Sequence, residues 1–405
     1  MPSLQGGHSV QLLINGQAYF PALIAALEAA RQEVLLETYI FHDDAAGEAV
    51  MIALEQAARR GVVVCLVVDG IGTPMLPQRW QLRMRESGVQ WQQFSPLGSL
   101  GLLIPGRWRR LHRKLCVVDR ELAFCGGINM IDDFFELNHG MQTSARFDFA
   151  VQVRGPLVAD IYNAMDQFWR RLLATRQLEQ GQFRVARRAL VGLAVLPRTD
   201  AEDSSDFGVG MASLGMRAAL LLRDNLRNRK GIERAYRHAI AHARQEVLIA
   251  NAYFLPGAKL RRALVHAVQR GVRVRLLLQG RYEFFMQFHG ARAFYGALLD
   301  AGVEIYEYQD GFLHAKVAVI DGKWATVGSS NLDPLSLLLA REANVVIDDA
   351  DFAQTLLEPL NAAIEQHSRR LDQTQFEHRP WLQRLQDRLA YRLMRLTLFL
   401  SGRDY

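Results

Sequence analysis

The chain has 405 residues, of which 50% are hydrophobic and 22% are charged. This composition supports two or three folded domains, and it excludes an intrinsically disordered, collagen-like or coiled-coil protein. Lysine and arginine outnumber aspartate and glutamate by 48 to 42, and the three cysteines form neither a C-x-x-C pair nor a disulfide framework. The N-terminal segment shows no signal-peptide pattern, and no apolar run reaches the 18 residues that a spanning helix requires.

The predicted elements alternate between helix and strand from the N-terminus. Apolar spacing predicts a helix over Leu23–Arg31 and a strand over Val34–Phe41. A second helix is predicted over Val50–Arg59, and a second strand over Val62–Val68. Such alternation is typical of an α/β domain with a parallel or mixed sheet.

The same order of elements returns later in the chain. The segment Ala-Arg-Gln-Glu-Val-Leu-Leu at 30–36 recurs as Ala-Arg-Gln-Glu-Val-Leu-Ile at 243–249. Likewise, Arg-Gly-Val-Val-Val at 60–64 recurs as Arg-Gly-Val-Arg-Val at 270–274. Two copies of one domain are therefore predicted.

The domain boundaries follow from composition. Residues 1–198 are predicted to form the first α/β domain and residues 217–370 the second. Between them, residues 199–216 are rich in Asp, Ser and Gly and are predicted to be a linker. Residues 371–405 form a basic tail.

A third repeated segment contains the residues best suited to chemistry. His112 and Lys114 are followed by Asp119 and then by Asn129, which ends a Gly-Gly-Ile-Asn run. The same four residue types recur with identical spacing as His314, Lys316, Asp321 and Asn331. A single H-x-K is weak evidence, but the duplicated H-x-K-x4-D-x6-G-[GS]-x-N pattern is specific.

The surrounding residues are of the β type, so side chains two apart share a face. His112 and Lys114 can therefore bind the same ligand, and so can His314 and Lys316. The aspartates come five residues after the lysines and point to the opposite face or lie at the strand end. We expect them to serve as a local salt bridge or turn anchor.

Phosphodiester exchange is the chemistry that fits this set. One histidine can attack phosphorus while the other protonates the leaving alcohol and later deprotonates the incoming one. Two lysines and two asparagine amides can stabilise the negative charge of the transition state without a metal. We find no P-loop for a nucleotide and no His/Cys cluster for zinc, so no cofactor is expected.

Two carboxylates occupy matching places downstream of the motifs. Asp148 and Glu342 each open an apolar strand after the asparagine of their own motif. We predict that each accepts a hydrogen bond from the histidine of its own half and fixes its tautomer. The alternative is a surface carboxylate at a strand start.

The duplicated motif resembles the signature of the phospholipase D superfamily. The flanking segments, including Leu-Glu-Thr-Tyr at 36–39 and Ala-Tyr-Phe at 252–254, resemble those of bacterial cardiolipin synthases of the shorter B type. The resemblance covers about residues 9–365. It implies two fused phospholipase D-like α/β domains related by a pseudo-two-fold axis, with the active site at their interface.

The resemblance also implies an activity and its residues. A phosphatidyl group would pass through a phosphohistidine to the glycerol of a second phosphatidylglycerol, releasing glycerol. The implied catalytic set is His112, Lys114, Asp119, His314, Lys316 and Asp321. Asn129, Asn331, Asp148 and Glu342 are expected to contribute to the substrate site. The expected partners are phosphatidylglycerol and a membrane surface, without nucleic acid, at the cytoplasmic face of the bacterial cell membrane.

Two segments have the composition of membrane-contacting elements. In residues 379–405, six arginines and regularly spaced leucines predict an amphipathic interfacial helix, or alternatively a helix that packs on the second domain. The apolar segment Leu100–Ile104 is followed by a cationic cluster and could enter the headgroup region, or be a plain strand and turn.

Two other functions remain open from the sequence. The first is a hydrolase of the same superfamily, acting on phospholipid or as a nuclease, because water can replace glycerol in the same chemistry. The second is a basic binding module with a decayed site, against which both complete motifs argue.

Overall fold

The computed structural model describes most of the chain. The described residues are 3–96, 105–179, 181, 215–224, 228, 230–283, 285–333 and 340–400. The predicted linker at 199–216 lies outside them except for its last two residues, and the apolar segment Leu100–Ile104 lies outside them entirely.

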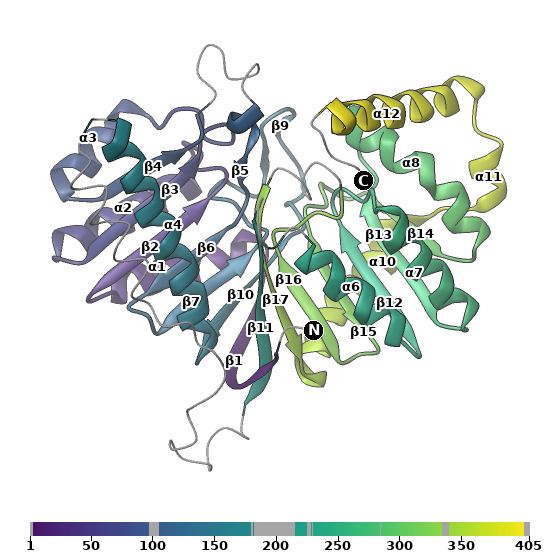
Figure 1. The fold of residues 1–405 in the computed structure, drawn as a ribbon, viewed down its shortest axis with the longest axis horizontal. Helices are drawn as coiled ribbons and strands as arrows, with labels where there is room; N and C mark the ends of the chain where they lie inside the picture. Colours follow the sequence, from purple (N-terminus) through teal and green to yellow (C-terminus); the bar gives the residue numbers. More distant parts are fainter. Residues whose placement is uncertain are drawn as a thin grey trace.

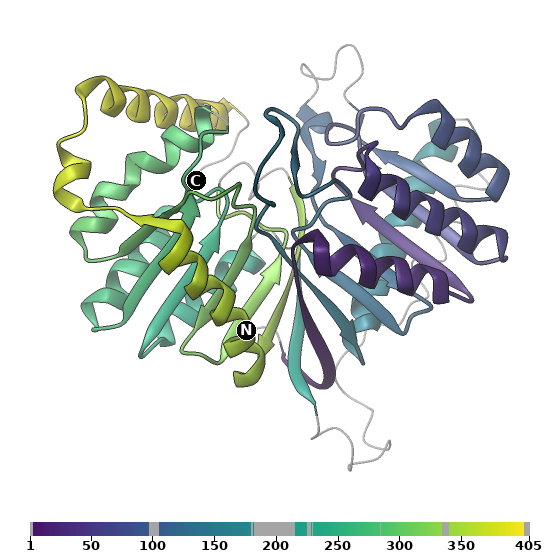
Figure 2. The same ribbon diagram turned by 180° about the vertical axis from the view of Figure 1, so that it is seen from behind.

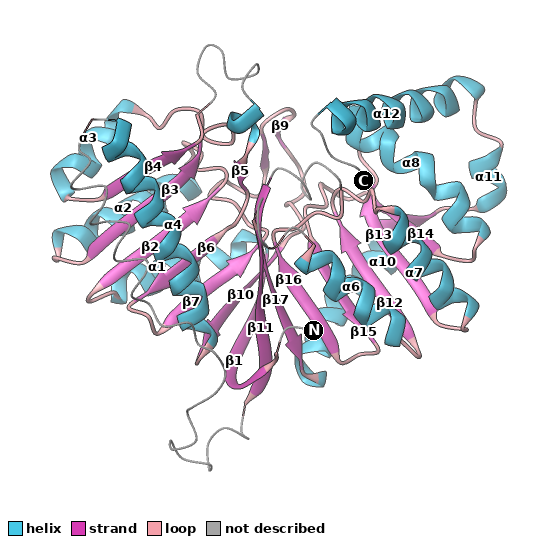
Figure 3. Ribbon diagram, viewed as in Figure 1, coloured by secondary structure: helices cyan, strands magenta, loops and turns pink. Residues whose placement is uncertain are grey.

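A single mixed β-sheet runs through the molecule with helices on both faces (Figures 1 and 3). The strand order is β18-β14-β13-β12-β15-β16-β17-β11-β1-β10-β7-β6-β2-β3-β4. Counted from either edge toward the centre, equivalent strands of the two halves occupy the same positions, apart from the extra strand β18 at the edge of the C-terminal half. The sheet thus has the α/β character and the internal symmetry expected from the repeated sequence.

The described residues of the N-terminal half supply seven strands along this path, the short β5 that pairs with β17, and four helices. Its elements are β1 (Gln5–Ile14), α1 (Asn15–Ala29), β2 (Glu33–Thr38), α2 (Ala45–Arg59), β3 (Val63–Asp69), α3 (Gln78–Ser87), β4 (Gln90–Phe94), β6 (Leu115–Val118), β7 (Leu122–Gly126), β10 (Phe149–Arg154) and α4 (Leu157–Glu179). Short elements join them: a 3₁₀ turn (Pro105–Trp108), β5 (Arg110–Leu111), and a hairpin of β8 (Phe135–Glu136) and β9 (Gly140–Met141).

The C-terminal half repeats the arrangement. Its elements are β11 (Met216–Arg223), α6 (Gly231–His242), β12 (Glu246–Asn251), α7 (Ala258–Gln269), β13 (Arg273–Gln279), α8 (Phe285–Asp300), β14 (Glu304–Tyr308), β15 (Lys316–Ile320), β16 (Trp324–Gly328), β17 (Ala340–Asp348), α10 (Ala350–His367) and β18 (Ser368–Arg370).

The local boundaries largely follow the sequence patterns. The first helix begins at Asn15 rather than near Leu23. Pro21 lies inside this helix, and because proline usually ends or precedes a helix, the sequence pattern did not indicate the turns before it. The strand predicted to reach Phe41 ends at Thr38, whose hydroxyl donates to the carbonyl of Ile40 in the following turn.

The two halves are related by a pseudo-two-fold axis. The central strands β1 and β11 pair antiparallel, with Gln5 opposite Ala218 and His8 opposite Met216. Helices α6 and α7 cover the front face of the C-terminal half in Figure 1, whereas α1 and α2 cover the back face of the N-terminal half in Figure 2. A rotation that exchanges the halves therefore also exchanges the faces.

The halves share a central hydrophobic cluster. Alongside a separate core within each half, a central cluster contains α4 residues such as Ile161 and Met165 together with α10 residues such as Leu356 and Leu360. Because this cluster is continuous across the axis, burial of apolar surface holds the halves in one arrangement.

The tail folds back on the C-terminal half as α11 (Gln373–Glu377) and α12 (Trp381–Leu400). The imidazole Nδ1 of His289 in α8 lies 2.8 Å from an Asp387 oxygen, and the rings of Phe294 and Tyr391 meet edge to face. One face of α12 therefore packs on α8, as Figure 1 shows. Among the described residues, no helix has the length and apolar character needed to cross a bilayer.

Candidate active site

The two motif histidines lie where the halves meet, at one end of the sheet. His112 follows β5, and its backbone N–H donates to the carbonyl of Arg341, 3.0 Å away in the other half. His314 precedes β15, and its backbone N–H donates to Phe147, 2.9 Å away in the first half. Each histidine segment is thus bonded to the strand region of the opposite half.

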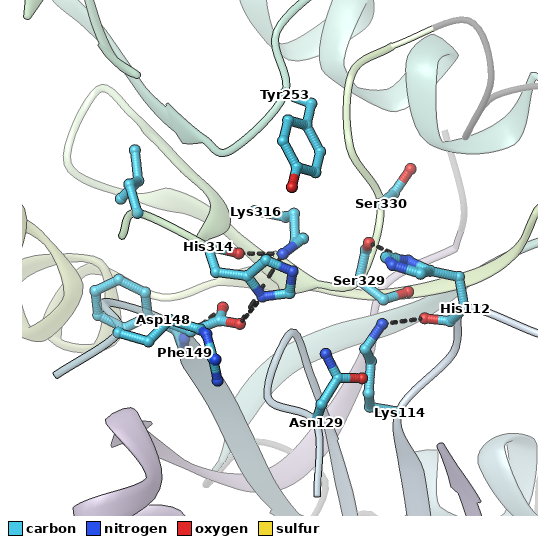
Figure 4. A network of polar contacts seen from close by, with 12 residues as sticks. His112, Lys114, Asn129, Asp148, Phe149, Tyr253, His314, Lys316, Ser329 and Ser330 are labelled. Atoms are coloured by element: carbon cyan, nitrogen blue, oxygen red, sulfur yellow. Dashed lines mark hydrogen bonds and ion pairs between the residues drawn. The ribbon is translucent and has the colours of Figure 1, made fainter. Parts of the chain in front are cut away.

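The carboxylate partners of the histidines are crossed between the halves. His112 Nδ1 lies 3.1 Å from Glu342 Oε2. His314 Nδ1 lies 2.6 Å from Asp148 Oδ2 (Figure 4). The prediction that each carboxylate serves its own half's histidine is therefore wrong, although the contacts involve the same four side chains. The cause is the backbone pairing across the axis, which places each histidine beside the other half's carboxylate strand.

Each carboxylate is buried, and the residue packed against it differs between the two halves. Ser329 donates its hydroxyl to Glu342 at 2.5 Å. At the equivalent place in the first half stands Gly127, where a Cβ would lie 2.3 Å from an Asp148 oxygen. Glycine is therefore required beside Asp148, whereas the serine at the matching position supplies a donor to Glu342.

The two lysines are almost completely buried beside the histidines. Lys114 Nζ donates to the carbonyl of His112 at 2.9 Å, and Lys316 Nζ donates to the carbonyl of His314. Burial lowers the pKa of Lys114 to about 7 and that of Lys316 to about 8. Their ammonium groups are therefore close to losing a proton unless an anion binds between them.

Burial also lowers the pKa values of the two histidines. It lowers the pKa of His112 despite the nearby Glu342 charge, and it lowers the pKa of His314 further, with help from the charges of Lys316 and Lys114. Figure 4 shows both imidazoles in one cluster with Lys114 and Lys316. With side chains 14% and 17% exposed, both imidazoles are accessible to a ligand in the neutral form that a nucleophile needs.

The motif asparagines are also buried next to the site. Asn129 accepts the backbone N–H of Ile40 through Oδ1 at 3.2 Å, and Figure 4 shows its side chain beside Lys114. Asn331 is buried at the matching position, and its Oδ1 has no hydrogen-bond partner among the described residues.

The motif aspartates lie away from the histidines. Asp119 is five residues beyond Lys114, roughly 16 Å along the strand. Its carboxylate accepts the backbone N–H groups of Arg31, Gln32 and Glu33 at 2.7–2.9 Å. Asp321 accepts the corresponding groups of Arg244, Gln245 and Glu246.

The turn-anchor role expected for both aspartates therefore agrees with their contacts. Their inclusion in the catalytic set does not, because neither carboxylate shares the space between the histidines. They fix the repeated Arg-Gln-Glu turns where β2 and β12 begin.

Several side chains of the site were not recognised from the sequence. The Tyr39 ring lies 5.0 Å from the His112 ring and 5.4 Å from Lys114 Nζ. On the other side, Tyr253 points toward Lys316 and His314 (Figure 4) and donates its hydroxyl to Glu283 at 2.6 Å. The described residues contain no group of three or more His, Cys, Asp or Glu that could hold a metal ion.

The comparisons with known families agree with this geometry. The family model described as "Cardiolipin synthase, PLD-like domain" matches residues 23–146 and 236–364, one region in each half. Cardiolipin synthase B of Escherichia coli strain K12 is 37% identical over 393 residues, covering 97% of this chain and 89% of the relative. The chain belongs to the cardiolipin synthase family of phospholipase D-like proteins.

Other relatives extend the family match. Cardiolipin synthase A of Pseudomonas putida strain F1 is 33% identical over 392 residues, covering 96% of this chain and 75% of the relative. The crystal structure of phosphatidylserine synthase from Haemophilus influenzae shares the fold, with a TM-score of 0.69 at 15% identity. That alignment covers 98% of this chain and 95% of the other.

Proposed function

We propose that this protein is a phosphatidyltransferase that makes cardiolipin and glycerol from two molecules of phosphatidylglycerol. The observation that carries the proposal is the pair of crossed histidine–carboxylate contacts with two buried lysines around one space. The similarity to cardiolipin synthases over nearly the whole chain supports the choice of substrate.

The reaction has two displacements at phosphorus. In the first, the Nε2 of one histidine attacks, a P–N bond forms, and the glycerol oxygen leaves with a proton from the other histidine. In the second, that other histidine removes a proton from a hydroxyl of a second phosphatidylglycerol, whose oxygen attacks as the P–N bond breaks. Glu342 and Asp148 accept the Nδ1 protons and keep Nε2 as the reacting atom.

The lysines stabilise the charge that collects on the phosphorus oxygens. Lys114 and Lys316 lie within one buried cluster with the two carboxylates, so few water molecules screen them. Binding an anionic phosphodiester raises their pKa values and keeps both ammonium groups charged. Asn129 and Asn331 are proposed to donate amide N–H groups to the same oxygens.

We further propose that the protein acts as a peripheral protein at the cytoplasmic face of the cell membrane and reaches its lipid through α12. The face of α12 opposite α8 exposes an apolar stripe of Trp381, Leu382, Leu385, Leu389 and Leu393. Arg384, Arg388 and Arg392 are exposed along one edge of that stripe at four-residue spacing. An apolar stripe beside a cationic row suits an anionic lipid surface.

The location of α12 supports this proposal. In Figure 1 it lies at the upper end of the molecule, the end that also holds β5. His112 directly follows β5 in the chain. A surface bound at this end would present lipid headgroups near the histidines. The packing on α8 and the contact with lipid are compatible, because they use opposite faces of the helix.

The activity is tested by incubating the purified protein with headgroup-labelled phosphatidylglycerol and resolving the products. Cardiolipin and labelled glycerol in equal amounts are expected. Phosphatidic acid without cardiolipin would instead identify a hydrolase, the other enzyme that the same residues could support.

A further inference from the structure

One difference between the halves at the site is a polar pair on the His314 side. In the repeated segments, β2 ends at Thr38 and β12 ends at Asn251, so Tyr253 corresponds to Ile40. The following residues, Phe41 and Phe254, make equivalent bridges to the segments after each motif. At this position the His314 side has a phenol and the His112 side an alkyl group, whereas the phenol beside His112, Tyr39, comes from the preceding position.

Tyr253 is held by a carboxylate that belongs to the C-terminal half. Its hydroxyl donates to Glu283 Oε2 at 2.6 Å, and Glu283 lies in the connection between β13 and α8. Figure 4 shows the Tyr253 hydroxyl directed toward Lys316 and His314.

The hydrogen-bonding directions on this side are set by buried partners. Because Tyr253 donates its only proton to Glu283, its hydroxyl can meet a ligand only as a hydrogen-bond acceptor. Because His314 donates from Nδ1 to Asp148, its Nε2 is also an acceptor. The lysines present only donors. Phosphate oxygens therefore suit the lysines, whereas the Tyr253 side suits a ligand with two O–H donors.

We propose that Tyr253, positioned by Glu283, binds one hydroxyl of a diol acceptor while His314 binds the adjacent hydroxyl that reacts. This inference rests on the proposed function and names the acceptor side of the site. The O–H proton moves to His314 Nε2 as the oxygen bonds to phosphorus, and the P–N bond to His112 breaks, returning its electron pair to that imidazole. His112 is accordingly the nucleophile, and the glycerol headgroup of phosphatidylglycerol supplies the diol.

The test measures acceptor preference in competition. Phosphatidylglycerol is the donor, and propylene glycol and propanol are supplied together, so that each preparation yields two products whose ratio is measured. The Tyr253→Phe variant is expected to lower the diol-to-monoalcohol ratio by about fivefold, the value of one hydrogen bond. Because both products come from the same active molecules, a loss of folded protein cancels in the ratio.

A neighbouring tyrosine provides the matched control. Tyr282 is half exposed and adjoins Glu283 in sequence, so Tyr282→Phe removes the same hydroxyl outside the site and should leave the ratio unchanged. An unchanged ratio in Tyr253→Phe would overturn the inference. Failure of the wild type to form either transfer product would instead contradict the proposed function.

A second variant tests the positioning role of Glu283. Glu283→Gln should raise KM for propylene glycol with little change in kcat, because the carboxylate acts through Tyr253. Adding it to Tyr253→Phe should lower the ratio no further than Tyr253→Phe alone. Additive losses in the double variant would contradict the assignment of the two residues to one unit.

Discussion

At the scale of single residues, each half supplies a histidine to the site and a carboxylate to the other half's histidine. Glu342 lies 230 positions from His112, and Asp148 lies 166 positions from His314. Neither half alone contains a complete histidine–carboxylate pair. The duplicated motif is therefore useful only when both copies meet across the pseudo-two-fold axis.

The crossed arrangement predicts which variants share a defect. With phosphatidyl-p-nitrophenol, whose leaving group needs no proton, Asp148→Asn and His314→Ala should keep the first displacement, whereas Glu342→Gln and His112→Ala should slow or lose it. Each carboxylate change should reduce the affected rate about 100-fold or more, because the imidazole loses its orienting acceptor. Stopped-flow measurement of p-nitrophenol release separates the two pairs of variants. Asp148→Asn reproducing the His112→Ala defect would contradict the crossed pairing.

The buried lysines predict a decline of activity in alkaline solution. Their pKa values of about 7 and about 8 mean that the charged forms are lost as the pH rises through this range. The kcat/KM for short-chain phosphatidylglycerol, which reports the ligand-free enzyme, should fall there.

A charge-preserving substitution identifies the group responsible. Lys114→Arg should move the alkaline limb of kcat/KM to higher pH, because a guanidinium stays charged, even where the maximum rate is reduced. An alkaline limb at the same pH in this variant would assign the titration to another group.

At the scale of elements, α12 packs on the C-terminal half with one face and exposes an apolar stripe on the opposite face. Ala390 and Asp387 are buried against the C-terminal half, while the apolar stripe on the other side is exposed. An isolated exposed leucine needs no explanation, but a row of them along one helix face beside arginines does. The sequence alone left packing and lipid contact as alternatives, because helical periodicity does not say which face is covered.

The stripe can be tested without disturbing the packed face. The double variant Leu385→Glu/Leu389→Glu should reduce binding to phosphatidylglycerol vesicles by about tenfold or more, since it removes apolar insertion and adds repulsion. Val63→Glu is the control, because Val63 is 52% exposed, as Leu385 is at 51%, but begins β3 at the other end of the sheet. Equal vesicle binding by both variants in a flotation assay would exclude the stripe as the lipid contact.

At the scale of the whole molecule, the sequence predicted the parts that repeat locally. The motif residues, both carboxylates and the α/β halves were identifiable because short spacings recur at matching positions. The carboxylate crossing was not, because it depends on contacts between distant segments. Tyr253 and Glu283 were missed for another reason: the pair occurs in one half only, so comparison of the copies gives no signal.

The continuous sheet predicts that the halves unfold together. β1 and β11 join them at the centre, and the shared cluster around α4 and α10 is buried only when both are folded. Hydrogen exchange in increasing urea should therefore expose peptides covering Glu33–Thr38 and Glu246–Asn251 at the same denaturant concentration, as in a single cooperative transition. Two separate midpoints would show that each half is stable alone, and that the crossed site assembles by docking of folded domains rather than during one folding event.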